Sequence, residues 1–270
     1  MQVSVVIPTF NRAELTVRAV ESVLSQTRKA DQIIVVDDGS TDDTLHRLAP
    51  FQDLTEVVSQ PNRGVSAARN RGISLAKHKW IAFLDSDDCW HPEKVAKQIA
   101  FHEAYPELLW SHTLEEWIRN GKKVSQKKHH RKPEGDVFYE NLPFCKIAPS
   151  AVMIHRTVLE KCGVFDENLP VCEDYDLWLR IAKHYPLGLL HEVLTTKYAG
   201  HPQLTASGYF LDRYRIEALM KHLPDPFVAA EIVEKITLLY KGALKYDNRE
   251  ILTFCEEARL RLSDQKRLFL

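Results

Sequence analysis

The stretches VSVVIPT (residues 3–9) and QIIVVDDGS (residues 32–40) decide the fold of this chain. Each opens with a short run rich in β-branched residues, Val3 to Ile7 in the first and Gln32 to Val36 in the second, as strands do. Between them, apolar side chains recur at helical spacing from Ala13 to Leu24. A strand, a helix and a strand in this order predict a parallel βαβ unit.

The alternation of strands and helices continues to about residue 113. A third strand is predicted at Glu56–Ser59, a helix at about Val65–Ala76 and an apolar strand at Trp80–Leu84. Pro92 is typical of a first helical turn, and Leu109–Thr113 has the pattern of another strand. The sequence therefore predicts an α/β fold with a doubly wound, mostly parallel sheet.

The remainder of the chain has a weaker pattern. It contains a predicted strand at Ala148–Ile154 and a short amphipathic helix at Asp174–Ala182. From Asp212 onward, apolar residues follow helical spacing in two long segments. We expect these segments to form a helical tail that packs on the core or on a partner.

The composition excludes several classes of protein. Lys and Arg total 36 against 37 Asp and Glu, and this balance gives no reason to expect nucleic acid as a partner. The five cysteines include no C-x-x-C pair, which disfavours a zinc cage and a disulfide framework. The chain shows neither a leader pattern nor an apolar run of the ~20 residues that span a bilayer, so we expect a cytoplasmic protein.

Polar clusters follow three of the predicted strands. They are Thr9-Phe10-Asn11, Asp37-Asp38-Gly39-Ser40 and Asp85-Ser86-Asp87-Asp88. In doubly wound sheets ligands bind outside the carboxyl ends of the strands, so the three clusters are expected to meet in one cleft.

Two of these clusters have the chemistry of a nucleotide site. Three carboxylates after a buried strand repel one another, and a hard divalent cation such as Mg²⁺ or Mn²⁺ suits the pair Asp85 and Asp87. A turn with Asx caps explains the same residues. Asp38 stands where an acid commonly binds ribose, although an Asp-Gly turn followed by a helix cap fits it equally well.

Two further positions carry candidate catalytic chemistry. Arg69 lies in the first turns of its helix, where it could meet a phosphate or a base; the alternative is an exposed, solvated arginine. Glu173 and Asp174 begin a helix, and an acid at that place can accept a proton from an incoming hydroxyl. Helix capping by Asp174 is the alternative.

Taken together, five blocks of the sequence resemble the family 2 glycosyltransferases with the GT-A fold, over roughly Val3 to Ser207. The blocks are VVIPTFNR (5–12), VVDDGSTD (35–42), NRG (62–64) continuing to ARNRG (68–72), FLDSDD (83–88) and EDYDLWLR (173–180).

The resemblance implies an inverting enzyme that moves a sugar from a nucleotide diphosphate, preferably UDP, to an acceptor hydroxyl. Asp174 would be the general base, and Glu173 would orient the neighbouring loop or acceptor. Mn²⁺ or Mg²⁺ would be bound by Asp87, Asp85 and His201, although Ala199 stands where the family usually has an arginine. The nucleotide sugar would be bound by Pro8, Thr9, Asn11, Asp38, Arg69, Asp85 and Ser86.

The resemblance also implies how the chain is divided and what it meets. A glycosyltransferase domain would cover residues 1–210, with a Rossmann-like nucleotide-sugar half at 1–113, an acceptor half at 114–210 and a helical extension at 211–270. Bacterial relatives commonly extend surface polysaccharides or lipid-linked glycans on the cytosolic membrane face. The basic run 122–132 would suit peripheral contact with an anionic membrane, and a solvated loop is the alternative. The oligomeric state stays open.

Three other functions share some of these features. A nucleotidyltransferase needs a similar cleft, but the chain lacks a Gly-rich, Lys-bearing loop near the N-terminus. A non-catalytic module that binds sugar nucleotides or glycans needs no base. The presence of both the aspartate-rich block and Asp174 in this chain argues against such a module. A nicotinamide dehydrogenase is excluded because no G-x-G-x-x-G follows the first strand.

Overall fold

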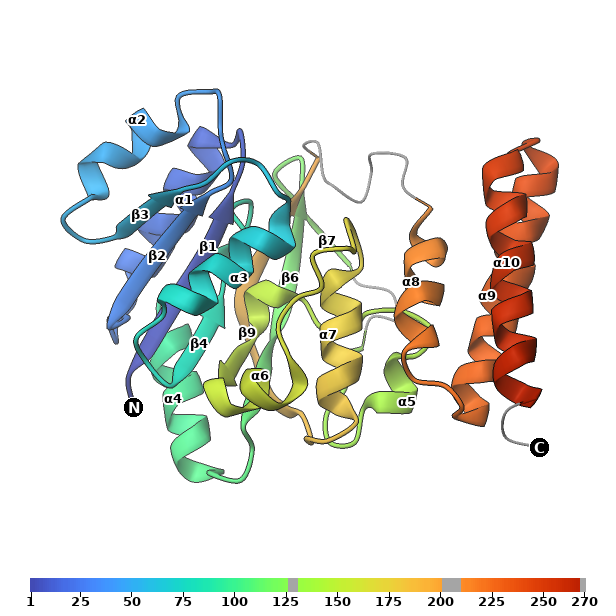
Figure 1. The fold of residues 1–270 in the computed structure, drawn as a ribbon. Helices are drawn as coiled ribbons and strands as arrows, with labels where there is room; N and C mark the ends of the chain where they lie inside the picture. Colours follow the sequence, from blue (N-terminus) through green and yellow to red (C-terminus); the bar gives the residue numbers. More distant parts are fainter. Residues whose placement is uncertain (126–130, 201–209, 268–270) are drawn as a thin grey trace.

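The computed structural model describes residues 1–125, 131–200 and 210–267 (Figure 1). Its strands are β1 (Val3–Thr9), β2 (Gln32–Asp37), β3 (Glu56–Ser59), β4 (Trp80–Phe83), β5 (Cys89–Trp90), β6 (Trp110–Arg119), β7 (Lys122–Val124), β8 (Met153–His155) and β9 (Gly188–Ala199). Its α-helices are α1 (Ala13–Leu24), α2 (Thr44–Leu48), α3 (Val65–Leu75), α4 (Lys94–Ala104), α5 (Phe138–Asn141), α6 (Arg156–Cys162), α7 (Glu173–Ala182), α8 (Leu211–Met220), α9 (Pro226–Lys245) and α10 (Arg249–Arg267).

The strands form one mixed sheet in the order β3-β2-β1-β4-β8-β6-β9-β5, and β7 pairs with β6 as a hairpin. The first four strands along the chain pair in parallel as predicted, with β1 between β2 and β4. Strand β8 lies antiparallel between β4 and β6. The predicted strand at Leu109–Thr113 is therefore present as part of β6 but is not the neighbour of β4.

Helices cover both faces of the sheet because successive residues of each strand point to opposite faces. On one face, the odd-numbered residues of β1, Val3, Val5 and Ile7, pack with α1, α2 and α4. On the other face, Val6 belongs to a larger apolar cluster with α3, α6 and α7. Every residue of β1 is buried, as the continuous apolar run required.

The C-terminal helices continue this second apolar cluster outward. Helix α8 packs on α7, and α9 and α10 form the outermost pair (Figure 1). Buried side chains from all three helices, including Ile216, Ile232 and Cys255, join the cluster. Within the described parts of the chain, no helix is sufficiently long and apolar to cross a membrane.

Three local features differ from the sequence prediction. Residues Pro149–Ala151 form a 3-10 turn, so the strand expected at Ala148–Ile154 is limited to β8. Strand β9 was not predicted, because its exposed His191 and Glu192 interrupt the apolar pattern. Strand β6 crosses the boundary placed at residue 113, so both halves share one sheet, and the division into 1–113, 114–210 and 211–270 stays a prediction.

Candidate active site

A cavity of about 880 Å³ opens beside the carboxyl ends of β1, β2 and β4. Residues from all three polar clusters line it, among them Thr9, Asp38 and Asp85. Glu173 and Asp174 line the same cavity from the start of α7. The strand ends therefore bring the predicted clusters together with the predicted acids of the helix.

Asp38 uses its carboxylate to shape the loop after β3. It accepts hydrogen bonds from Gln60 Nε2 (2.8 Å) and from the backbone N–H groups of Arg63 (3.0 Å) and Gly64 (2.7 Å). Gly64 has φ of +88°, a conformation that favours glycine, and it leads directly into α3. Asp38 thus positions the helix that carries Arg69.

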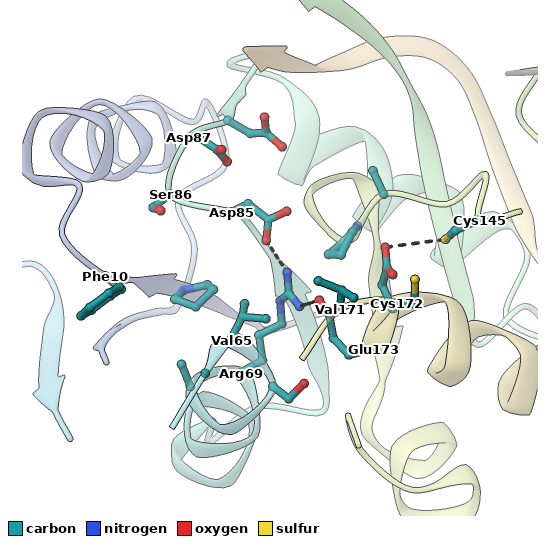
Figure 2. A pocket seen from close by; sticks show the side chains of 18 of the residues that line it. Phe10, Val65, Arg69, Asp85, Ser86, Asp87, Cys145, Val171, Cys172 and Glu173 are labelled. Atoms are coloured by element: carbon teal, nitrogen blue, oxygen red, sulfur yellow. Dashed lines mark hydrogen bonds and ion pairs between the residues drawn. The ribbon is translucent and has the colours of Figure 1, made fainter. Parts of the chain in front are cut away.

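The block after β1 divides into residues that line the cavity and one that does not. Pro8, Thr9 and Phe10 line it, and the Phe10 ring is 43% exposed (Figure 2). The Thr9 hydroxyl lies 2.6 Å from the Thr16 hydroxyl in α1. Asn11 is not among the lining residues, because its side-chain oxygen accepts the Thr41 N–H at 2.7 Å and joins two loops.

The aspartate cluster after β4 is matched by basic side chains. The pairs are Asp85 with Arg69 (2.7 Å), Asp87 with Arg12 (2.8 Å) and Asp88 with Lys197 (3.5 Å). Burial tends to raise the pKa of Asp85, but the positive charges of Arg69 and Lys197 outweigh it and hold the pKa below its usual value. The basic partners thus offset part of the repulsion expected among the three carboxylates, and Asp88 still has a raised pKa to which Asp87 and Asp85 contribute.

The residues nevertheless fit a hard dication that shares its ligands with a substrate. Within the described residues, no group of three or more acidic, His or Cys side chains is placed to hold a metal by itself. Mg²⁺ and Mn²⁺ often need only one or two carboxylates when phosphates and water complete the shell. Asp85 and Asp87 both line the cavity, and burial raises the pKa of the adjacent Asp88 to about 7 even with Lys197 opposing it.

Arg69 links the aspartate cluster to the start of α7. Its guanidinium donates to Asp85 Oδ1 at 2.7 Å and to Glu173 Oε1 at 2.6 Å (Figure 2). It also lies over the Phe165 ring. The side chain is 4% exposed. Burial raises the pKa of Glu173 to about 7, while the charge of Arg69 acts in the opposite direction. Arg69 is therefore a buried bridge between two carboxylates of the cavity wall.

Asp174 has the environment of a proton acceptor. Burial raises the pKa of its carboxyl group above the usual value, although the charge of Arg69 and the Tyr175 N–H oppose the shift. The Cys145 thiol lies 3.6 Å from Asp174 Oδ2. Burial raises the pKa of Cys145 well above its usual value, so the thiol stays protonated, and its single proton is within reach of both Asp174 and the Ile147 carbonyl oxygen at 3.2 Å. A carboxylate with a raised pKa is suited to general base catalysis near neutral pH.

Cys145 belongs to a segment that we name the wall loop, residues 142–147. Four of its backbone carbonyl groups accept hydrogen bonds from side chains elsewhere in the chain. The donors are Tyr175 to Leu142 O (2.5 Å), Lys235 to Pro143 O (2.6 Å), Lys132 to Lys146 O (2.8 Å) and Trp178 to Ile147 O (3.0 Å). The wall loop is thus fixed by α7, by α9 and by the segment before α5.

Some cavity residues were not predicted. Lys197 lies on the unpredicted strand β9, and no local motif marks it. Lys132 was read as the end of a basic run, but its ammonium is buried against Glu115 at 2.8 Å. Arg12 stands inside the first block, and its pairing with Asp87 has no signal in the sequence. The predicted ligand His201 and residues 126–130 of the basic run lie outside the described residues.

Comparison with known proteins assigns the family and the fold of this chain. Residues 4–163 match the family described as Glycosyl transferase family 2, and the chain belongs to this family. The first 349 residues of Staphylococcus aureus TarS have the same fold, with a TM-score of 0.73, 19% identity and coverage of 98% of this chain and 81% of that one. The mixed sheet followed by C-terminal helices is therefore of the GT-A type.

Two sequence relatives are similar over most of the chain. An uncharacterized glycosyltransferase of Rickettsia felis is 37% identical over 196 residues, which are 72% of this chain and 32% of the relative. The chain thus spans about a third of the length of that relative. Escherichia coli WfaP, named as a UDP-Glc:alpha-D-GlcNAc-diphosphoundecaprenol beta-1,3-glucosyltransferase, is 32% identical over 229 residues, which are 82% of this chain and 86% of WfaP.

Proposed function

We propose that this protein is an inverting hexosyltransferase that transfers a sugar from a UDP-sugar to a hydroxyl group of a lipid-linked glycan. The observation that carries the proposal is the shared cavity, in which the buried Arg69 joins Asp85 of the donor side to Glu173, the neighbour of Asp174. Family membership favours sugar transfer over the nucleotidyltransferase alternative.

Asp174 is the general base in this proposal. Its carboxylate takes the proton from the acceptor hydroxyl while the oxygen attacks the anomeric carbon of the donor. The bond from that carbon to the diphosphate oxygen breaks, and UDP leaves from the opposite face, which inverts the configuration. Arg69 fixes Glu173, the neighbour of Asp174, and acts as a positioning residue, and the Cys145 thiol contacts the Asp174 carboxylate.

Residues after β1 and β2 bind the nucleotide. The exposed Phe10 ring offers a stacking surface to the base, and Pro8, Thr9 and Asp38 form the adjacent wall. Ser86 lies in the same lining between Asp85 and Asp87. Asn11 contributes through the loop that it fixes.

A divalent cation completes the donor site, with Asp87 and Asp85 as its protein ligands. When bound, Mn²⁺ or Mg²⁺ supplies Lewis-acid stabilisation of the charge on the departing diphosphate. Because the Asp87 carboxylate is paired with Arg12, its use as a metal ligand requires that Arg12 share or release it. The role predicted for His201 stays a prediction.

The donor and acceptor classes are supported by the relative that covers most of the chain. WfaP is named for a UDP-Glc donor and a diphosphoundecaprenol-linked GlcNAc acceptor. An acceptor of this kind lies at a membrane, so we place the protein at the inner face of the cell membrane. Contact through residues 122–132 stays a prediction.

The donor side is tested by thermal shift with nucleoside diphosphates and their sugars, each with and without Mn²⁺. Selective stabilisation by UDP and its sugars that requires Mn²⁺ and disappears in Asp87→Ala is expected, whereas Asp53→Ala, which removes an exposed acid, should behave as the unaltered protein. Equal stabilisation with and without metal would contradict the metal assignment.

The base is tested by Asp174→Asn, which keeps the shape of the side chain. We expect unchanged UDP-sugar affinity and a loss of transfer by about two to four orders of magnitude. Transfer at a near-normal rate would refute the assignment, and donor binding without any turnover in the unaltered protein would favour a binding module.

A further inference from the structure

One part of the cavity has no role in the proposed reaction. Glu115 and Trp117 of β6, together with Lys132, line it beside the wall loop. The Cys145 thiol connects this part to the base, because it contacts Asp174 and lies within the field of the Lys132 charge. The volume of about 880 Å³ is near the upper end for ligand sites and is suited to two substrates.

Trp117 is unusual among the five tryptophans of the chain. The other four, Trp80, Trp90, Trp110 and Trp178, are at most 9% exposed. Trp117 is only half-buried and belongs to the cavity lining. Residues two apart on a strand share a face, so Trp117 and Glu115 face the cavity together. The indole N–H donates to Glu115 Oε1 at 2.8 Å, which fixes the orientation of the ring.

Glu115 is a buried carboxylate held in its ionised form. Its side chain is 2% exposed and lies 2.8 Å from the Lys132 ammonium, which is 6% exposed. Burial tends to raise the pKa of Glu115, but the charges of Lys132 and Lys197 lower it overall. A buried ion pair costs desolvation energy, and a pair of apolar side chains would serve packing as well. Its place in a cavity wall points to recognition of a polar ligand.

We propose that Trp117, Glu115 and Lys132 form the subsite that holds the sugar ring of the acceptor. This proposal rests on the proposed function and assigns the acceptor side of the same cavity. A pyranose has an apolar face of C–H groups and a rim of hydroxyl groups. The indole face packs against the C–H groups and the Lys132 ammonium donates to a hydroxyl, while the buried Glu115 carboxylate holds both the ring and the ammonium in place. The ring is thereby held next to Asp174.

Tryptophan fluorescence provides a readout that does not depend on turnover. Iodide should quench Trp117 selectively, and Trp117→Phe should remove the quenchable fraction, because the other four tryptophans are buried. We expect a GlcNAc diphosphate carrying a short alkyl chain to protect Trp117 from iodide. UDP-glucose with Mn²⁺ should leave the quenching unchanged. Protection by UDP-glucose alone would overturn the proposal, since it would assign the ring to the donor.

Kinetics with the same acceptor analogue give the second test. Trp117→Ala should raise the acceptor KM about tenfold to hundredfold, as truncation of a central aromatic contact does. Trp117→Phe retains a ring and should stay within a few fold of the unaltered protein. The thermal shift produced by UDP should be the same in all three proteins. An acceptor KM that changes less than twofold in Trp117→Ala would refute the subsite.

Failure of the subsite and failure of the proposed function have different signatures. If UDP-sugars neither stabilise the protein nor support turnover, the proposed function fails. If donor binding and transfer are present but neither quenching nor KM responds at Trp117, only the subsite fails. Glu115→Gln adds a check within the subsite, because it keeps the shape but removes the charge opposite Lys132 and should also raise the acceptor KM.

Discussion

Removing the bridge at Arg69 should destabilise the fold strongly. Arg69→Met keeps a side chain of similar length but leaves Asp85 and Glu173 buried without their shared cation. Breaking a buried pair by removing one partner costs about 3–5 kcal/mol. Because a carboxyl group without its cation takes up a proton more readily, the pKa of Glu173 should rise above the present value of about 7. The destabilisation should therefore be larger at pH 8 than at pH 5.5.

Urea unfolding followed by circular dichroism measures this effect. With a slope of about 3 kcal/mol per molar urea, a loss of about 4 kcal/mol shifts the midpoint by roughly 1 M. Arg71→Met is the matched control, because Arg71 lies on the same helix and is exposed. If the two variants unfold within about 0.5 kcal/mol of each other at pH 8, the ion pairs do not stabilise the fold as argued.

Three further predictions concern buried groups that do not line the cavity. Burial lowers the pKa of His102 to about 4 and of His112 to about 3, so the unfolded chain binds more protons below pH 6.5. Each imidazole should lower the stability in urea by about 1.4 kcal/mol per pH unit from about pH 6.5 down to these values, whereas the raised pKa values of Asp88 and Glu173 act in the opposite direction over the same range. The contribution of His102 is therefore measured as the difference between the pH profiles of the unaltered protein and His102→Gln, and identical slopes of the two between pH 6.5 and 5 would contradict it. Lys94 is fully buried, and burial alone lowers its pKa well below the usual value, so Lys94→Met should raise the melting temperature; a lower one would show that its contacts with the Gln98 side chain and the Trp90 ring matter more. Lys235→Met removes the charged hydrogen bond to the Pro143 carbonyl of the wall loop, so Cys145 should react with iodoacetamide about tenfold faster. Lys241→Met, which alters an exposed lysine of the same helix, should leave this rate unchanged.

The first half of the fold was predictable because local patterns decide it. The β-branched runs at Val3–Ile7 and Gln32–Val36 became β1 and β2, and the predicted third strand coincides with β3. Strand β9 was missed because its pairing partner β6 is more than seventy residues earlier in the chain. Its exposed His191 and Glu192 also interrupt the apolar pattern, so no local pattern marks the strand.

The candidate site was likewise predictable only in part. Acids that follow strands or begin helices, such as Asp85 and Asp174, were located by position, and the structure brings them to one cavity. The cations that pair with the aspartate cluster come from the residue before α1, from α3 and from β9, so only the tertiary fold shows them. The catalytic and ligand roles of these residues stay predictions until the variants are measured.

The anchoring of the wall loop has a consequence for how such an enzyme can change its acceptor. All four anchors bind main-chain oxygen atoms, which every amino acid provides. A side chain of the wall loop that is neither packed in the core, as Ile147 is, nor in contact with Asp174, as Cys145 is, can therefore be exchanged without altering the course of the loop. Lys146, which lines the cavity, is such a position, at which acceptor preference can diverge during evolution, or be redesigned in the laboratory, while the catalytic framework stays in place.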